Sequence, residues 1–136
     1  MPSNLAKKLT SLSENVWNMY GPTETTIWST CFKLDEKELT TSIGKPILNT
    51  SIYILDSDLN PVPEGEQGEL FIGGKGVSRG YLNQLELTKT SFILNPFSVD
   101  STDILYKTGD IVRKTISGNL DFIGRIGFQV KIRGFR

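Results

Sequence analysis

The sequence predicts an α/β protein: the end of a layered α/β core, followed by a larger β-rich part that forms a distorted, barrel-like sheet. Two observations support this fold class. Leucines recur at helical spacing over residues 4–12, and residues 15–20 then form a short run rich in apolar and aromatic side chains. From residue 44 onward, short apolar runs alternate with turn-forming residues, which is typical of antiparallel strands. At 136 residues the chain is long enough to bury a core.

The first part of the chain supplies one helix and two strands. The helix is predicted over residues 4–12 with Ser3 as a candidate cap, and the first strand over residues 15–20. Residues 25–34 are dense in β-branched and aromatic side chains and predict a second strand. Residues 35–41 are charged and predict an exposed loop.

The β-rich part supplies strands joined by tight turns. Strands are predicted over residues 51–55, 68–72, 105–107, 111–115, 120–123 and 129–133, and one or two helical turns over 86–92. The strands 111–115 and 120–123 form a hairpin at residues 117–119. We place a boundary near residue 43, which divides the chain into residues 1–43, 44–124 and 125–136.

The composition excludes several classes of protein. Fifteen basic and fifteen acidic residues cancel, which argues against nucleic acid and anionic membranes as partners. The sequence contains no histidine, so nucleophile pairs that use imidazole and histidine-ligated zinc sites are excluded. No apolar run is long enough to span a bilayer or to serve as a signal peptide, and we expect a cytoplasmic protein.

The stretch from Asn18 to Glu24 combines an aromatic ring, a forced turn, a hydroxyl and a carboxylate. One interpretation is a helix start, with Gly21 as N-cap, Pro22 at the first helical position and Glu24 at the third. The other is a nucleotide site: Tyr20 offers a flat face on which a base can stack, and Thr23 and Glu24 offer the hard oxygens that suit Mg²⁺ held together with phosphates.

Four segments resemble, in the same order, the adenylation domains of nonribosomal peptide synthetases, within the adenylate-forming superfamily. They are NMYGPTE at residues 18–24, GELFIGGKGVSRGYL at 68–82, YKTGD at 106–110, and GR at 124–125 followed by QVKIRGFR at 129–136. Four motifs in the correct order are far more specific than any one of them. The resemblance covers essentially the whole chain.

The resemblance implies a two-step reaction. An amino acid carboxylate attacks the α-phosphate of ATP in the presence of Mg²⁺, giving an aminoacyl-AMP and pyrophosphate. The aminoacyl group then passes to the phosphopantetheine thiol of a peptidyl carrier protein domain. A condensation domain in the same synthetase is a further implied partner.

The resemblance also implies roles for residues near the start of the chain. Tyr20 stacks on adenine, and Asn18 and Gly21 line the nucleotide site. Thr23 contacts phosphate and Glu24 holds Mg²⁺; these two are the candidate catalytic residues.

Other roles follow from the same resemblance. Asp110 accepts hydrogen bonds from the ribose hydroxyls, and Arg125 lies by the nucleotide. Met19, Ile27 and Trp28 line the amino acid pocket. Because all three are bulky, the pocket favours a small side chain, with a slight preference for glycine. From the residues alone, the alternative is that Ile27 and Trp28 belong to a strand core, and that Asp110 and Arg125 are a turn residue and a solvated charge.

The chain departs from the family pattern at two positions. Gly127 stands where the family usually has the aspartate about which the small domain rotates, so the predicted hinge residue is a glycine. Phe122 stands where the family commonly has a tyrosine that hydrogen-bonds the sugar. The loss of that bond costs about 1 kcal/mol of nucleotide affinity.

The family's glycine-rich phosphate loop and catalytic lysine have no counterpart in the chain, so we expect a fragment of an adenylation domain that does not adenylate by itself. Two alternatives stay open. The first is an acyl-CoA or aryl-acid ligase of the same superfamily, and the second is a degenerate, non-catalytic β-rich binding module.

Overall fold

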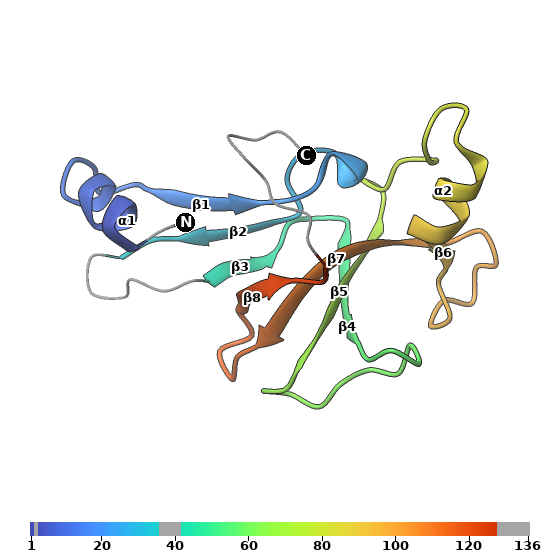
Figure 1. The fold of residues 1–136 in the computed structure, drawn as a ribbon. Helices are drawn as coiled ribbons and strands as arrows, with labels where there is room; N and C mark the ends of the chain where they lie inside the picture. Colours follow the sequence, from blue (N-terminus) through green and yellow to red (C-terminus); the bar gives the residue numbers. More distant parts are fainter. Residues whose placement is uncertain (2, 36–41, 128–136) are drawn as a thin grey trace.

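The computed structural model describes residues 1, 3–35 and 42–127, which form two short helices, one 3₁₀ turn and eight strands (Figure 1). In chain order the elements are α1 (Ser3–Thr10), β1 (Trp17–Tyr20), η1 (Thr23–Thr25), β2 (Thr30–Lys33), β3 (Ser42–Pro46), β4 (Thr50–Leu55), β5 (Gln67–Gly74), α2 (Leu85–Ser91), β6 (Phe92–Leu94), β7 (Ile104–Lys114) and β8 (Leu120–Arg125).

All eight strands belong to one antiparallel sheet. Its order is β1-β2-β3-β8-β7-β5-β4, and β6 pairs with β7 beside this path. β1 and β4 lie at opposite ends of the order, so the sheet of the described residues is not closed. Figure 1 shows β1 and β2 extending to the left, while β4 and β5 run at a steep angle to them in the middle of the view. The prediction of an α/β fragment with a β-rich, distorted barrel-like part is confirmed in that the described residues form a sheet-rich fold with two helices.

The core lies on both faces of β5. Leu70 and Ile72 point into one apolar cluster, together with Ile43, Val112 and Leu120. Phe71, between them in sequence, points to the other face and packs with Leu55 and Leu105. Side chains alternate along a strand, so a run of apolar residues such as LFI is expected where both faces are covered.

Several sequence predictions are confirmed and others need correction. The strand predictions 51–55 and 68–72, the helical turns near 86–92 and the hairpin at 117–119 are confirmed by β4, β5, α2 and the β7–β8 turn. Helix α1 already includes Ser3, so this residue is not its cap. Of the predicted exposed loop 35–41, Asp35 is described and is exposed, whereas residues 36–41 and the predicted strand 129–133 lie outside the described residues.

Three strand predictions were wrong in their bounds. The strand predicted over residues 25–34 is limited to Thr30–Lys33. Thr25 belongs to the 3₁₀ turn η1, and Thr26 and Ile27 adopt φ of 63° and 70°, which a β-strand does not allow. The strands predicted over 105–107 and 111–115 are one continuous strand, β7. The boundary that we place near residue 43 falls inside β3.

β3 connects the two halves of the sheet, because it pairs with β2 on one edge and with β8 on the other. Gly44, at φ 78°, allows β3 to approach β2 closely: a Cβ atom at this position would lie 1.8 Å from the backbone oxygen of Cys31. Ser42 ties β3 to β8, since its hydroxyl donates to Leu120 O at 3.1 Å and accepts from Gly44 N.

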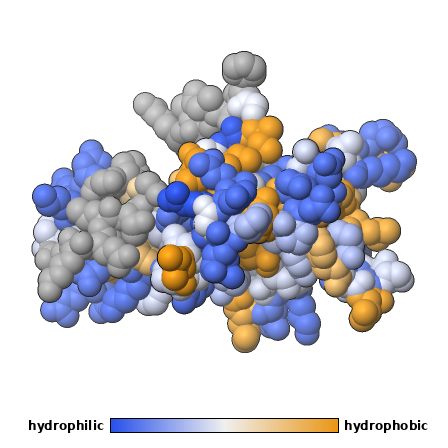
Figure 2. Space-filling view, turned by 90° about the horizontal axis from the view of Figure 1, so that it is seen from below, coloured by the Kyte–Doolittle hydropathy of each residue, from blue (hydrophilic) through white to orange (hydrophobic). Residues whose placement is uncertain are grey.

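The two described helices have eight and seven residues, and neither is long and apolar enough to cross a membrane. On the face shown in Figure 2, hydrophobic residues form several separate groups among hydrophilic ones. Exposed large apolar side chains are spread along the chain and include residues of connecting segments, for example Leu48, Leu82, Val99 and Ile116.

The close approach at Gly44 leads to a stability prediction. Gly65 is a matched control, because it also has positive φ (88°) but no atom lies within 4 Å of an added Cβ. We expect Gly65→Ala to lower the free energy of unfolding by about 1–2 kcal/mol. Gly44→Ala should cost a further ~1–3 kcal/mol, because β2 and β3 must separate.

Urea unfolding of both variants measures the difference. Equal losses for the two variants would show that the close contact between β2 and β3 is not needed for folding.

Candidate functional site

The predicted site residues Tyr20, Asp110 and Arg125 form one cluster. The Tyr20 hydroxyl donates to Asp110 Oδ2 at 2.5 Å, although the two residues lie 90 positions apart in sequence. Arg125 Nη1 donates to Asp110 Oδ1 at 2.9 Å, and Nη2 donates to Thr108 O at 3.1 Å. The three side chains come from the end of β1, the middle of β7 and the end of β8. We call them the Tyr20–Asp110–Arg125 cluster.

A bulge in β7 positions Asp110. Lys107 pairs with Phe71 and Ile111 pairs with Glu69, so three residues of β7 stand opposite the single residue Leu70. Gly109 adopts φ 72° within this bulge, a value that glycine reaches at little steric cost. The Thr108 hydroxyl donates to Leu70 O at 2.7 Å and accepts from Asp110 N at 3.0 Å.

Within the cluster, Asp110 is almost closed to solvent, whereas Tyr20 and Arg125 are partly exposed. The side chain of Asp110 is 5% exposed and that of Arg125 19%. Burial, and next the neighbouring Asp110 charge, raise the pKa of the Tyr20 phenol far above its usual range, so Tyr20 stays protonated and donates to the carboxylate. A carboxylate has about four acceptor positions. Each oxygen of Asp110 therefore keeps a position for another donor, such as a vicinal hydroxyl.

The turn after Tyr20 depends on Gly21. A Cβ at this position would lie 2.5 Å from Ile27 O and 2.7 Å from Ser29 N, and Ser29 N donates to Tyr20 O at 2.8 Å. A side chain would therefore push the returning segment away. Asn18 is buried against β3, where its amide donates to Ser42 O at 2.6 Å.

Thr23 and Glu24 lie on the 3₁₀ turn η1. The predicted helix start is corrected in two respects: Pro22, not Gly21, is the N-cap, and the helix has only three residues. Thr23 is exposed, whereas Glu24 is buried and its Oε1 accepts from the Tyr81 hydroxyl at 2.6 Å. Within the described ranges, no three or more carboxylate, cysteine or histidine side chains gather as a metal site.

The predicted amino acid pocket residues lie on either side of this turn. Ile27 and Trp28 are 66% and 55% exposed and lie in the segment between η1 and β2. They are therefore not part of a strand core. Met19 is partly buried in β1, opposite Cys31 of β2.

The predicted hinge residue Gly127 follows β8 and is exposed. It adopts φ 80°, and no atom lies within 4 Å of an added Cβ. Phe122 lies on the inner side of β8, partly buried against the core, with its ring centroid 6.4 Å from that of Tyr20. Its ring therefore supports Tyr20.

The structure adds three polar residues to the site that the sequence did not single out: Glu69, Tyr81 and Thr108. Glu69 Oε1 accepts from Gly109 N at 3.0 Å, beside the bulge. One signal could have found it. A charged residue inside the apolar run GELFI needs a partner if the strand is buried.

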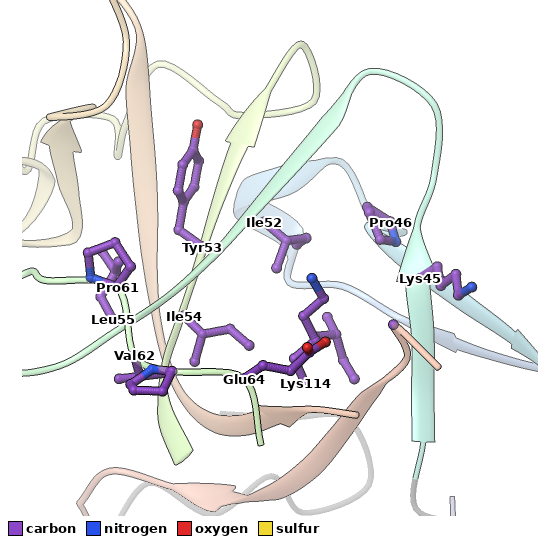
Figure 3. A pocket seen from close by; sticks show the side chains of 13 residues that line it. Lys45, Pro46, Ile52, Tyr53, Ile54, Leu55, Pro61, Val62, Glu64 and Lys114 are labelled. Atoms are coloured by element: carbon purple, nitrogen blue, oxygen red, sulfur yellow. The ribbon is translucent and has the colours of Figure 1, made fainter. Parts of the chain in front are cut away.

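Two cavities differ in their relation to the cluster. The larger, of about 740 Å³, is lined by residues such as Lys45, Ile52, Ile54 and Lys114, and by none of the predicted site residues (Figure 3). The smaller, of about 370 Å³, borders Tyr81, the Thr108–Gly109 bulge and Arg125. We assign the candidate site to the region of the smaller cavity, because Arg125 of the cluster lines it and Asp110 directly follows its lining residue Gly109.

Comparison with known proteins gives a consistent result. The family model described as "AMP-binding enzyme" matches residues 1–82. A dimodular nonribosomal peptide synthase of Bacillus subtilis (strain 168) is 48% identical, in a match that covers 100% of this chain and 6% of that protein. Tyrocidine synthase 3 of Brevibacillus parabrevis is also 48% identical, over 89% of this chain and 2% of that protein. The chain thus spans a small part of the curated relatives that it matches.

Two solved structures are also similar. A four-domain nonribosomal peptide synthetase bound to AMP and glycine has a TM-score of 0.85 and 42% identity, covering 100% of this chain and 10% of the other. A synthetase protein containing adenylation and PCP domains, bound to a vinylsulfonamide inhibitor, has a TM-score of 0.90 and 30% identity, covering 99% of this chain and 24% of the other.

The buried ion pair of the cluster leads to a second prediction. Arg125→Met leaves the Asp110 carboxylate buried without its cation, and we expect a loss of about 3 kcal/mol in the free energy of unfolding. Arg113→Met is the matched control. It removes a pair with Asp121 at 3.4 Å in which Arg113 is 45% exposed, and it should cost less than ~1 kcal/mol.

Chemical denaturation of the two variants, side by side with the unmodified protein, measures both losses. If Arg125→Met costs no more than Arg113→Met, the carboxylate of Asp110 does not depend on Arg125.

Proposed function

The chain belongs to the AMP-binding enzyme family, and from this we propose that it forms part of an adenylation domain that activates an amino acid for nonribosomal peptide synthesis. In this reaction the amino acid carboxylate attacks the α-phosphate of ATP, the bond to the β-phosphate breaks, and aminoacyl-AMP and pyrophosphate form. The similarity to peptide synthetases over nearly the whole chain supports this assignment.

The observation that carries the proposal is the Tyr20–Asp110–Arg125 cluster. The carboxylate of Asp110 has acceptor positions for the two ribose hydroxyls, and hydrogen bonds to a charged acceptor are the stronger kind. Because Asp110 is nearly closed to solvent, the cluster opens when the ribose enters. Arg125 is 19% exposed against 5% for Asp110, and we propose that it is the side chain that moves.

The neighbouring motif residues serve the base and the phosphates. Adenine stacks on the ring of Tyr20, whose phenol is held by Asp110. Gly21 lets the chain turn closely behind the base. Asn18 lines the adenine pocket and is held in place by its hydrogen bond to Ser42 O of β3.

Thr23 and Glu24 fit a Mg²⁺ ion that is shared with ATP phosphates, because they offer hard oxygen ligands. Mg²⁺, when bound, neutralises charge on the phosphates. The Thr23 hydroxyl is exposed and can donate to a phosphate oxygen. Glu24 is held in place by Tyr81 until the ion binds.

Met19, Ile27 and Trp28 are proposed to line the amino acid pocket. Ile27 and Trp28 are exposed in the described residues, which leaves them free to contact a ligand. Their bulk favours a small side chain, and glycine is the preferred candidate because a similar synthetase was solved with AMP and glycine.

We further propose that the aminoacyl group passes to the phosphopantetheine arm of a peptidyl carrier domain, with a condensation domain in the same synthetase. A PCP-containing structure among the similar proteins supports the carrier partner. Between the two half-reactions the small domain would rotate about Gly127, whose φ of 80° suits a glycine.

The alternatives make different demands on the same residues. An acyl-CoA or aryl-acid ligase would keep the nucleotide residues and change the carboxylic acid. A degenerate binding module, which Phe122 and Gly127 favour, would show no dependence on Mg-ATP.

The proposal is tested by amino-acid-dependent exchange of labelled pyrophosphate into ATP, with the complete protein in which this chain occurs. We expect exchange with a small amino acid, and none with large ones, because of the bulk of the pocket residues. Exchange with aryl or fatty acids would instead establish the other ligase class.

The control is the same protein without Mg²⁺. Absence of exchange with every carboxylic acid, from protein shown to be folded, would overturn the adenylating function.

A further inference from the structure

Glu69 is a buried carboxylate inside the sheet that the proposed function does not use. It lies in β5 between Gly68 and Leu70 and is 9% exposed. Its Oε1 accepts from Gly109 N at 3.0 Å, and its Oε2 lies 3.5 Å from Lys107 Nζ. Both partners belong to β7, on either side of Thr108.

The ion pair with Lys107 does not account for a buried glutamate. Lys107 has a side chain that is 47% exposed, and a pair with so exposed a cation contributes little to stability. Taking a carboxylate out of water is costly unless strong hydrogen bonds compensate it. The bond from Gly109 N is such a charge-assisted hydrogen bond.

Gly109 N lies in the bulge, where the regular pairing between β5 and β7 is interrupted. Glu69 supplies from its side chain the acceptor that a regular strand partner would supply from its backbone. The strand β5 thus holds the bulge at two points, through Glu69 and through Leu70 O, which accepts from Thr108.

The other edge of the bulge is held by β8. Arg125 Nη2 donates to Thr108 O at 3.1 Å, and Ile126 N donates to Gly109 O at 2.7 Å. The peptide units on both sides of Gly109 therefore have fixed orientations. Asp110 is the next residue, so its carboxylate direction follows from the orientation of the bulge.

We propose that Glu69 is a positioning residue, which fixes the bulge at Gly109 and thereby directs the Asp110 carboxylate toward the ribose of the nucleotide. This inference rests on the proposed function. Glu69 is assigned a role through its hydrogen bond with Gly109 and no contact with the nucleotide. It acts through Gly109, and its loss should affect nucleotide binding more than binding of the amino acid.

The experiment compares four variants of the complete protein: Glu69→Gln, Glu69→Leu, Glu69→Asp and Lys107→Met. Glu69→Gln keeps an acceptor oxygen on a side chain of the same length, and Glu69→Leu removes the acceptor. Glu69→Asp keeps the carboxylate but shortens the side chain by one methylene. Lys107→Met removes the ion pair alone. Pyrophosphate exchange is measured with ATP varied and, separately, with the amino acid varied.

We expect Glu69→Leu to raise KM for ATP roughly tenfold, the effect of one lost charge-assisted hydrogen bond. KM for the amino acid should change less than about twofold. Glu69→Asp should give an intermediate rise in KM for ATP, whereas Glu69→Gln and Lys107→Met should resemble the unmodified protein. Equal rises in both KM values, or none in the Leu and Asp variants, would overturn the inference.

Hydrogen exchange gives a second readout that does not need activity. In Glu69→Leu, or in Glu69→Asp if the Leu variant does not fold, the amide of Gly109 should exchange at least about tenfold faster, while amides of β4 stay unchanged. An unchanged rate at Gly109 would overturn the positioning role.

The two proposals fail in different ways. If the unmodified protein shows no exchange of pyrophosphate into ATP, the proposed function fails. The hydrogen-exchange rate of the Gly109 amide in the Glu69 variants then still shows whether Glu69 holds the bulge. If the unmodified protein is active and the Glu69 variants keep its KM for ATP, the positioning role alone fails.

Discussion

The close pairing of β3 with both of its neighbours is the constraint on which the site depends. Among the described strands, β3 alone carries the pairing of β1 and β2 over to the rest of the sheet. It does so at short range, because Gly44 has no side chain to hold β2 away, and because Ser42 bonds to Leu120 O on the other side. Tyr20 and Asp110 lie in different halves of the sheet, so their hydrogen bond forms only when β3 has joined these halves.

A second feature is that polar groups are buried where the sheet is least regular. The β7 bulge exposes backbone groups that a regular ladder would pair, and Glu69, Thr108 and Arg125 pair them instead. Such a network is costly when incomplete and rigid when complete. In the described part of the chain, no deeply buried side-chain nitrogen or oxygen is left without a partner. The rigidity is therefore concentrated beside the candidate nucleotide site.

Apolar runs and turn residues in the sequence predicted the strands and turns that depend on neighbouring residues alone. The apolar runs 51–55 and 68–72 are strands because both faces of β5 are covered, and the turn at 117–119 follows from its glycine. The β-branched residues after Glu24 favour a strand, but distant contacts bend them: Thr26 donates to Gly76 O at 2.7 Å, and Ser78 N to Glu24 O at 2.8 Å. The motifs named Tyr20, Asp110 and Arg125, which the structure brings together, whereas the contact of Glu69 with Gly109 joins residues 40 positions apart and no local pattern shows it.

The pairing of β3 with β8 has a consequence for the newly made chain. The hydrogen bond between Ser42 and Leu120 joins residues 78 positions apart. At a synthesis rate of about 5–20 residues per second, β3 waits roughly 4–16 s after leaving the ribosome before its partner β8 has been made. During this time one edge of β3 carries unpaired backbone groups, which are able to pair with other chains. The ribosome-bound chain is thus most prone to aggregate just before the last described strand is made.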